Sequence, residues 1–371
     1  MPLEPPRRAH RLTQDQDRKS LKSLDIAVIP GDGIGVEVTQ AACSVLDTAA
    51  DLHGFSLTTQ QYPWSCDYYL RHGVMMPPEG VDLLRRHDAI LLGAVGWPAR
   101  VPDNVSLHGL LLPIRKAFDL FVNARPHKLL PGITGPLRST GFNILCIREN
   151  TEGEYSGAGG RVHAGTPDEV AVETAIFTRR GVERVLRYAF GEARRRRKRL
   201  CSVTKSNAQK HTMVFWDEVT DTLARGYPDV TVEKVHVDAA AARFVLHPSS
   251  LDVVVASNLF GDILSDLGAA IQGGLGLAAS ANINPSGDVP CMFEPVHGSA
   301  PNIAGRGIAN PLAAIWSANL MLNYLGEPAA ADSIMRAMES LTAEGADGLT
   351  PDLGGVATTS QVADKIIARM T

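Results

Sequence analysis

Two aspartates stand four residues apart in the stretch NLFGDILSD at residues 258–266. They are Asp262 and Asp266, and on a helix this spacing places both carboxylates on one face, where like charges repel. Mg²⁺ and Mn²⁺ bind carboxylate oxygens and keep open positions for a substrate, so a hard-cation site is one interpretation. A solvent-facing acidic pair near the start of a helix, where the helix dipole favours acids, is an equally good one.

Three arginines stand among apolar neighbours, in the segments LPIR, NARP and CIRE. They are Arg115, Arg125 and Arg148. An arginine fork binds a carboxylate bidentately, so a cluster of forks suits a diacid substrate. The sequence alone does not show that the three converge, and ion pairing at the surface is the commoner fate of an arginine.

Two segments with glycines are candidate ligand loops. PGDGIG at 30–35 has the spacing GxGxG instead of the GxGxxG of a dinucleotide fingerprint, and a plain turn between a strand and a helix explains it as well. Residues 294–302, EPVHGSAPN, together with Gly305 and Asn310, predict a long loop. Such a loop can wrap a ligand with backbone donors, although a purely structural loop is the default interpretation.

Short apolar runs predict the buried strands that must position these groups, at 24–29, 89–95, 143–148, 200–204 and 252–257. Thr178–Arg194 predicts an amphipathic helix. The helix expected over 258–271 places five apolar residues on the face opposite the aspartates: Phe260, Ile263, Leu264, Leu267 and Ile271. Strands that alternate with helices indicate a largely parallel α/β sheet.

Length and charge limit the classes of function. A chain of 371 residues suits two domains or one large α/β unit. Its 36 Lys+Arg against 40 Asp+Glu give a net charge of −4, which argues against a nucleic acid or an anionic membrane as partner. No apolar run approaches the ~18 residues of a membrane span. Five scattered cysteines exclude a disulfide scaffold and a CxxC zinc site and suit a reducing cytosol, so we expect a cytoplasmic enzyme.

Two polar segments lie outside this pattern. Residues 1–24 are rich in Arg and Pro and predict a disordered arm. A mitochondrial transit peptide is the alternative, but Glu4, Asp15 and Asp17 argue against it because such peptides avoid acids. The basic block Arg194–Arg199 is expected to be the solvated end of a helix, since a nucleic-acid patch fits poorly with the balanced charge elsewhere.

Taken together, these motifs resemble those of the β-decarboxylating dehydrogenases, the family of isocitrate and 3-isopropylmalate dehydrogenases, from about Asp25 to the C-terminus. The most specific segments are PGDGIG (30–35), NLFGDILSDL (258–267) and EPVHGSAP (294–301), joined by NxRP (123–126) and RENTEGEY (148–155). Within the family, residues 62–73, 93–107, 204–207 and 242–248 look most like the tartrate dehydrogenase and D-malate dehydrogenase (decarboxylating) branch.

The resemblance implies an isocitrate/isopropylmalate dehydrogenase-like α/β fold that is not a Rossmann fold. Two α/β domains would share one long mixed sheet, and the active sites would be shared between the subunits of a homodimer. The cofactor-side domain would comprise residues 25–120 and 273–371. The dimerisation and substrate domain would comprise residues 121–272.

The resemblance also implies a role for each motif residue. Mg²⁺ or Mn²⁺ would be held by Asp262 and Asp266 with Asp238 of the partner subunit. Lys205 of the partner subunit would be the general base at the substrate hydroxyl, and Tyr155 would be the acid that protonates the carbon after CO₂ leaves. Four residues would bind the substrate: Arg115, Arg125, Arg148 and His108. Eight would bind NAD: Ile34, His297, Gly298, Ser299, Ala300, Asn302, Ile303 and Asn310. A monovalent cation is a further candidate cofactor.

The choice of substrate within the family rests on the segment before Arg115. Isopropylmalate enzymes have a glutamate seven residues before this arginine, where the chain has His108, while Leu111 and Leu112 are retained. No serine or asparagine lies between His108 and Arg115 to meet the third carboxylate of isocitrate. We therefore expect oxidative decarboxylation of a small four-carbon 2-hydroxy diacid, D-malate to pyruvate and CO₂ first and tartrate oxidation second.

Other assignments remain as alternatives. A 3-isopropylmalate or homoisocitrate dehydrogenase is the nearest, and a non-catalytic paralogue is disfavoured because every motif residue that chemistry needs is present. Asn302 stands where NAD-dependent members of the family usually have aspartate. NAD is therefore expected to be preferred, with weaker discrimination against NADP.

Overall fold

The computed structural model describes residues 22–137 and 141–370, which form two compact units. The first unit consists of the chain up to Asp119, of Leu130–Thr134 and of the chain from Gln272 on, and the second of Leu120–Leu129 and Gly135–Ile271. Most of the predicted N-terminal arm, residues 1–21, lies outside the described residues. The first strand begins at Ser23, one residue earlier than expected.

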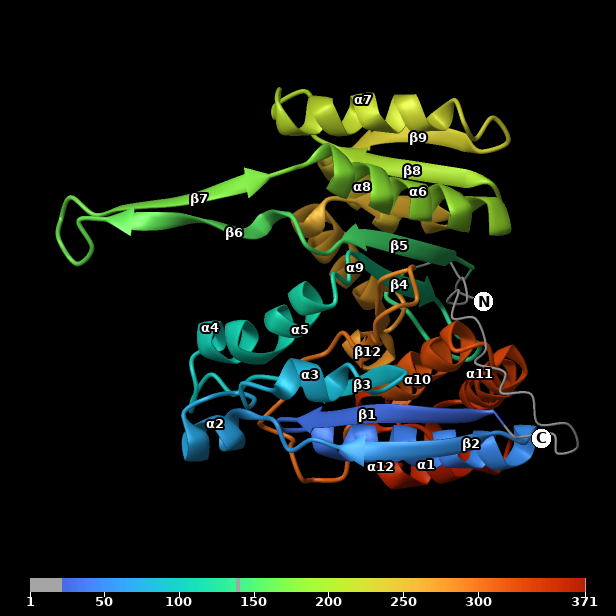
Figure 1. The fold of residues 1–371 in the computed structure, drawn as a ribbon. Coiled ribbons are helices and arrows are strands. Elements are labelled where there is room, and N and C mark those ends of the chain that lie inside the picture. Colours follow the sequence, from blue (N-terminus) through green and yellow to red (C-terminus); the bar gives the residue numbers. More distant parts are fainter. Residues whose placement is uncertain (1–21, 138–140, 371) are drawn as a thin grey trace, which may run out of the picture. The chain divides into compact units, whose positions relative to one another are not determined.

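The first unit is built on a mixed set of strands in the order β2-β1-β3-β12-β11. Figure 1 labels the first four of them. Neighbours are parallel except for the antiparallel pair β11 and β12. The strands are β1 (Ser23–Gly31), β2 (Ser56–Gln61), β3 (Ala89–Ala94), β11 (Ala279–Ile283) and β12 (Cys291–Pro295). Each residue of β3, β11 and β12 is buried. This explains the unbroken apolar run that predicted β3.

Helices connect and cover these strands. They are α1 (Gly35–His53), α2 (Cys66–His72), α3 (Gly80–Leu84), α4 (Asp103–Ser106), α5 (Leu112–Ala117), α10 (Leu312–Tyr324), α11 (Pro328–Ala343) and α12 (Thr359–Ile367). A π-helical turn at Leu107–Leu111 leads into α5. Helix α10 is buried on all sides and forms the centre of the core of this unit, because it packs against strands as well as α1 and α11.

The second unit has the strand order β4-β5-β10-β8-β9. Its strands are β4 (Val122–Lys128), β5 (Asn143–Glu149), β8 (Arg199–Thr204), β9 (Thr231–His236) and β10 (Val253–Ala256). Only β4 and β5 pair antiparallel among these neighbours, within the strands that the structure describes. The helices are α6 (Arg179–Arg195), α7 (Thr212–Ala224), α8 (Val237–Leu246) and α9 (Asn258–Ile271).

A two-stranded antiparallel hairpin, β6 (Gly153–Val162) and β7 (Val170–Ile176), extends away from the strands of the second unit (Figure 1). Most of its residues are exposed, and four of the exposed side chains are large and apolar: Val162, Val170, Val172 and Ile176. Isolated hairpins are at best marginally stable in water.

The strand and helix predictions are confirmed with small changes at the ends. The predicted helix over 178–194 is α6, and the side chains on its apolar stripe are buried. The turn interpretation of PGDGIG is also confirmed, because Gly31 has φ +72° and a Cβ there would lie 1.9 Å from the carbonyl oxygen of Ala94. None of the helices in the described ranges is long and apolar enough to cross a membrane.

Three expectations need correction. Ile263 does not share the buried face of α9, since it is 57% exposed while Phe260, Leu264 and Ile271 are buried. Ile263 lies at the edge of that face, one residue from Asp262. The basic block is not simply solvated, because the Arg196 side chain is 9% exposed and its Nε lies 2.7 Å from the buried Asp252. Glu294 and Pro295 end strand β12 and are not part of the predicted loop.

Candidate active site

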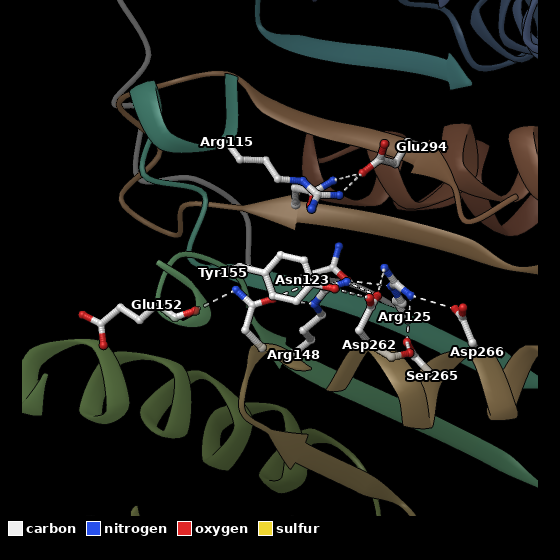
Figure 2. A network of polar contacts seen from close by, with 12 residues as sticks. Arg115, Asn123, Arg125, Arg148, Glu152, Tyr155, Asp262, Ser265, Asp266 and Glu294 are labelled. Carbon is white, nitrogen blue, oxygen red and sulfur yellow. Dashed lines mark hydrogen bonds and ion pairs between the residues drawn. The ribbon is translucent and has the colours of Figure 1, made fainter. Parts of the chain in front are cut away.

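A polar cluster in the second unit is built on β4, β5 and α9 (Figure 2). Side chains alternate along a strand, so Asn123, Arg125 and His127 of β4 lie on one face. Arg148 on β5 pairs directly with Asn123 in the antiparallel register. On its other side Arg148 pairs with Ala256, the last residue of β10, and α9 begins two residues later. The two arginines therefore lie where the first turns of α9 can reach them.

Arg125 is buried and its guanidinium is bonded on several sides. Nε donates to Asn123 Oδ1 at 2.7 Å, and Nη1 donates to Ser265 Oγ at 2.7 Å and to Asp266 Oδ1 at 3.2 Å. Nη2 lies 3.4 Å from Asp262 Oδ1. These partners fix the plane of the fork and join it to both aspartates.

Arg148 is held in a similar way. Nε and Nη2 donate to Asn258 Oδ1 at 3.0 and 2.8 Å, and Nη1 donates to Asp262 Oδ1. A Cβ on Gly261 would lie 2.7 Å from the Cβ of Arg148, so the glycine of the NLFGD motif allows α9 to approach β5. Surface ion pairing, the bland interpretation of these arginines, is therefore wrong: Arg125 is 5% and Arg148 is 4% exposed.

The two aspartates of α9 have side chains that are 31% (Asp262) and 57% (Asp266) exposed. Partial desolvation raises the pKa of Asp266; Arg125 opposes this effect and the like charge of Asp262 adds to it. The Tyr155 hydroxyl donates to Asp262 Oδ2 at 3.0 Å, and the Arg148 guanidinium lies 5.3 Å from the centre of the Tyr155 ring. Burial and the Asp262 carboxylate raise the pKa of Tyr155, which keeps the phenol protonated at neutral pH.

The donor set fits a hard divalent cation, because two carboxylates on one helix face offer oxygen ligands. Within the described parts of a single chain, no group of three or more histidine, cysteine or acidic side chains is placed to hold a metal ion.

Lys205 and Asp238 lie together elsewhere in the second unit, with Nζ 2.7 Å from Oδ1. Lys205 follows β8, and Asp238 is the second residue of α8, just after β9. The parallel strands β8 and β9 pair to their last residues, Thr204 and His236. Their side chains are 26% and 68% exposed. The hydrogen bond from Lys205 lowers the pKa of Asp238.

In the first unit, Arg115 on α5 lies 2.6 Å from the carboxylate of Glu294 on β12, measured from Nη2 to Oε1 (Figure 2). Asn282 of β11 donates to the same oxygen at 2.7 Å. Both members of the ion pair are buried. His108 is exposed on the π-helical turn, seven residues before Arg115.

The segment after β12 contacts the PGDGIG turn. The Ile34 amide donates to the carbonyl oxygen of Ser299 at 2.8 Å, and a Cβ on Gly33 would lie 2.0 Å from that oxygen. Ala300 has φ +39°, and Gly298 beside it is exposed. His297 is buried, with Nδ1 3.0 Å from the carbonyl oxygen of Gly298, and burial lowers its pKa.

The remaining residues expected at the dinucleotide divide into two groups. Asn302 is exposed and Ile303 is half-buried, with its amide bonded to the carbonyl of Ala300. Asn310 is buried, and its amide group donates to Asp352 Oδ2 and accepts from the Leu312 amide, both at 3.0 Å. The Asn310 side chain is therefore fixed at the start of α10.

Sequence reasoning missed several polar side chains that hold the arginines: Asn123, Asn258, Ser265, Asn282 and Glu294. All but Asn282 lie inside the motifs NxRP, NLFGDILSD and EPVHGSAP, where their polar character within apolar elements was the available signal. Asn282 stands in a buried run with no motif to mark it.

Comparison with known proteins identifies the family. Residues 25–366 match the model of the family described as isocitrate/isopropylmalate dehydrogenase. The chain is 52% identical to a probable tartrate dehydrogenase/decarboxylase of Bacillus subtilis, over 95% of this chain and 99% of that protein. It is 51% identical to the D-malate dehydrogenase (decarboxylating) of Escherichia coli, over 93% of this chain and 98% of that protein.

Solved structures agree. An isocitrate dehydrogenase from Methylococcus capsulatus superimposes with a TM-score of 0.85 at 35% identity, covering 94% of this chain and 99% of that one. The fold class expected from the motifs is thereby confirmed, as is the resemblance to the tartrate and D-malate dehydrogenase branch. The chain belongs to the isocitrate/isopropylmalate dehydrogenase family.

Proposed function

We propose that this protein catalyses the oxidative decarboxylation of a four-carbon 2-hydroxy diacid, D-malate first and tartrate second, with NAD and Mg²⁺ or Mn²⁺. The family makes the chain an oxidoreductase. The single observation that carries the proposal is the contact of two buried guanidinium groups, Arg125 and Arg148, with the carboxylates of Asp262 and Asp266.

Charge counting supports a diacid. The two guanidinium groups and the two carboxylates of the cluster cancel, and so do the paired Lys205 and Asp238 that the partner subunit would contribute. A divalent cation would therefore leave two positive charges. A 2-hydroxy diacid carries two negative charges at neutral pH, whereas a tricarboxylate carries a third. A buried excess charge is costly, so the balance favours the diacid.

Each step of the proposed reaction has a group in this chain, its partner or a bound cofactor that would perform it. When bound, the divalent cation would lower the pKa of the substrate hydroxyl and stabilise the negative charge left as CO₂ departs, and NAD would accept the hydride. Arg125 and Arg148 would bind the carboxylates and orient the substrate. Lys205 of the partner subunit would take the hydroxyl proton, and Tyr155, protonated at neutral pH, would deliver a proton to the carbon that loses CO₂. Arg115, held by Glu294, and His108 would complete substrate binding.

The names of the relatives support the same substrate class, since proteins about half identical to this chain are called tartrate and D-malate dehydrogenases. The residues before Arg115 support it too, because His108 stands where isopropylmalate enzymes have a glutamate and no hydroxyl or amide side chain lies between His108 and Arg115. Leu111 and Leu112 are half-buried and would suit the branched chain of 3-isopropylmalate, which makes that diacid the second candidate.

NAD is the proposed dinucleotide, bound at the segment from His297 to Asn310 and near Ile34. The exposed Asn302 would donate or accept one hydrogen bond at the adenosine ribose. Lacking a negative charge, it would repel a ribose phosphate less than an aspartate does. The discrimination against NADP would therefore be incomplete.

A homodimer with shared active sites is part of the proposal. Three exposed apolar side chains on α8 and α9, Val245, Leu246 and Ile263, offer a surface for a second copy close to the metal-binding face. The exposed valines of the β6 and β7 hairpin offer another. Such a dimer would let the Lys205 and Asp238 pair of one chain reach the aspartates of the other. We propose a cytoplasmic location, because all five cysteines are unpaired.

The test is a panel of substrates with purified protein, following reduction of NAD and of NADP by absorbance. The panel contains D-malate, L-malate, both active tartrates, meso-tartrate, isocitrate and 3-isopropylmalate. The proposal predicts that D-malate or a tartrate has the highest kcat/KM, with NAD and only with a divalent cation. A tenfold or greater preference for 3-isopropylmalate over D-malate would refute it.

A further inference from the structure

Asn258 lies between the Arg148 guanidinium and the turn that begins β6. It is the first residue of α9 and is 2% exposed. Its Oδ1 accepts from Nε and Nη2 of Arg148 at 3.0 and 2.8 Å, and its Nδ2 donates to the carbonyl oxygen of Glu152 at 3.0 Å. Figure 2 includes Arg148 and Glu152 on the two sides of this contact.

The orientation of the Asn258 amide follows from its partners. A guanidinium only donates hydrogen bonds and a carbonyl only accepts them, so the amide oxygen must face Arg148 and the amide nitrogen must face Glu152. The Glu152 backbone is itself anchored, because its amide donates to Glu149 Oε2 at 2.8 Å and its carboxylate accepts from the Thr178 amide at 2.8 Å. Asn258 thus ties Arg148 to a fixed point of the chain.

The acceptor on this edge of Arg148 is neutral, and this distinguishes it from the acceptor at Arg115. The Arg115 guanidinium is held by a carboxylate, that of Glu294, at 2.6 Å. Arg148 Nη1 already donates to the carboxylate of Asp262, a proposed metal ligand. A carboxylate at position 258 would make a stronger hydrogen bond to Arg148 but would place a second negative charge beside the guanidinium. An amide fixes the plane of the fork without adding that charge.

We propose that Asn258 is a positioning residue that orients Arg148 without adding a second negative charge, beside that of Asp262, that would oppose a substrate carboxylate. The substrate class in this inference rests on the proposed function. The orientation of the guanidinium does not, so it can be tested without a substrate.

The experiment compares two variants with the wild type, Asn258→Asp and Asn258→Ala. Both lose the contact with Glu152, and only the aspartate adds a negative charge beside Arg148. The matched control is Asn143→Asp, because the exposed Asn143 also accepts from an arginine, with Oδ1 2.8 Å from Arg196 Nη2. Binding of D-malate with Mg²⁺ and without dinucleotide is measured by calorimetry, and kcat and KM follow from steady-state kinetics.

The inference predicts that Asn258→Asp weakens D-malate binding and raises KM by about tenfold or more, with a smaller effect on kcat. Asn258→Ala is expected to weaken D-malate binding less, and Asn143→Asp is expected to bind D-malate as the wild type does. A merely structural role predicts the reverse order, because aspartate preserves the shape of the side chain and alanine does not. Wild-type affinity in Asn258→Asp, or weaker binding in Asn258→Ala than in Asn258→Asp, would overturn the inference.

Crystal structures of the wild type and of Asn258→Ala separate this inference from the proposed function. Removal of the amide is expected to turn the Arg148 guanidinium out of its present plane, and an unmoved guanidinium would overturn the positioning role. Failure of the wild type to bind or oxidise any diacid of the panel would instead refute the proposed function, and the crystal structures would still decide the role of Asn258.

Discussion

Lys205 Nζ lies 2.7 Å from Asp238 Oδ1, at the carboxyl ends of the neighbouring parallel strands β8 and β9. Because the two strands pair to their last residues, Lys205 and Asp238 are held side by side. A second chain that contacts Lys205 would therefore also contact Asp238. The proposed dimer would thus receive a metal ligand and a general base from the same place.

Replacement of Lys205 by methionine tests its role as the base. The variant is expected to have a kcat lower by about 10²- to 10⁴-fold with a smaller change in KM. The reason is that a proton acceptor is lost while the arginines proposed to bind the substrate remain. Steady-state kinetics with D-malate measure this. Lys234→Met is the control, since Lys234 also pairs with an aspartate, Asp221, at 2.6 Å. Equal losses in the two variants would exclude a catalytic role for Lys205.

Arg125→Lys tests the proposed binding of a substrate carboxylate by Arg125. Lysine keeps the charge but loses the planar fork that contacts Asn123, Ser265 and Asp266. We expect the KM for D-malate to rise about 10- to 100-fold. The control is Arg369→Lys, because Arg369 contacts Glu344 through two nitrogens on the first unit. An unchanged KM in Arg125→Lys would contradict a role of Arg125 in substrate binding.

Asp262→Asn tests the metal site. The variant removes the charge of one proposed ligand, so the concentration of Mg²⁺ needed for half-maximal activity is expected to rise at least about tenfold. A titration of Mg²⁺ measures it, and a chelator is expected to abolish wild-type activity. Asp221→Asn serves as the control. Full activity of the wild type in the chelator would rule out the cation.

The buried His127 predicts a loss of stability in acid. Burial, with a contribution from Arg125, lowers its pKa from the ordinary 6.5 to about 3, and both ring nitrogens lack a partner among the described residues. The folded protein therefore binds fewer protons than the unfolded chain below pH 6.5. With respect to His127, the free energy of unfolding is highest above pH 6.5 and decreases as the pH falls toward 3.

Urea unfolding near pH 7 and near pH 5 measures this effect, and His127 alone predicts a loss of about 2 kcal/mol between them. His127→Phe is expected to reduce the difference by about that amount. His72→Gln, at an exposed position, is expected to leave it unchanged. If His127→Phe retained the whole pH dependence, His127 would not be its source.

Local sequence patterns could predict the helices, strands and turns. They could not predict the side-chain contacts of the site, which join residues far apart in the sequence. The α6 stripe and the PGDGIG turn depend on residues close in sequence, and both were recognisable. The contact between Arg115 and Glu294 joins residues 179 positions apart, and that between Arg148 and Asn258 joins residues 110 apart. No periodicity encodes such pairs. Ile263 was misassigned for a related reason, because the edge of a helix face is buried or exposed according to what packs beside it.

The most direct test of the shared site is a hybrid dimer. Lys205→Met and Asp262→Asn are co-expressed with different affinity tags, and dimers that carry both tags are isolated. Activity toward D-malate is measured at a Mg²⁺ concentration too low for Asp262→Asn alone, so that each parent variant is nearly inactive. In the hybrid dimer one site combines the intact Asp262 of one chain with the intact Lys205 of the other, so about half of the wild-type activity is expected. A hybrid as inactive as its parents would show that each chain builds its own site, and would contradict the account.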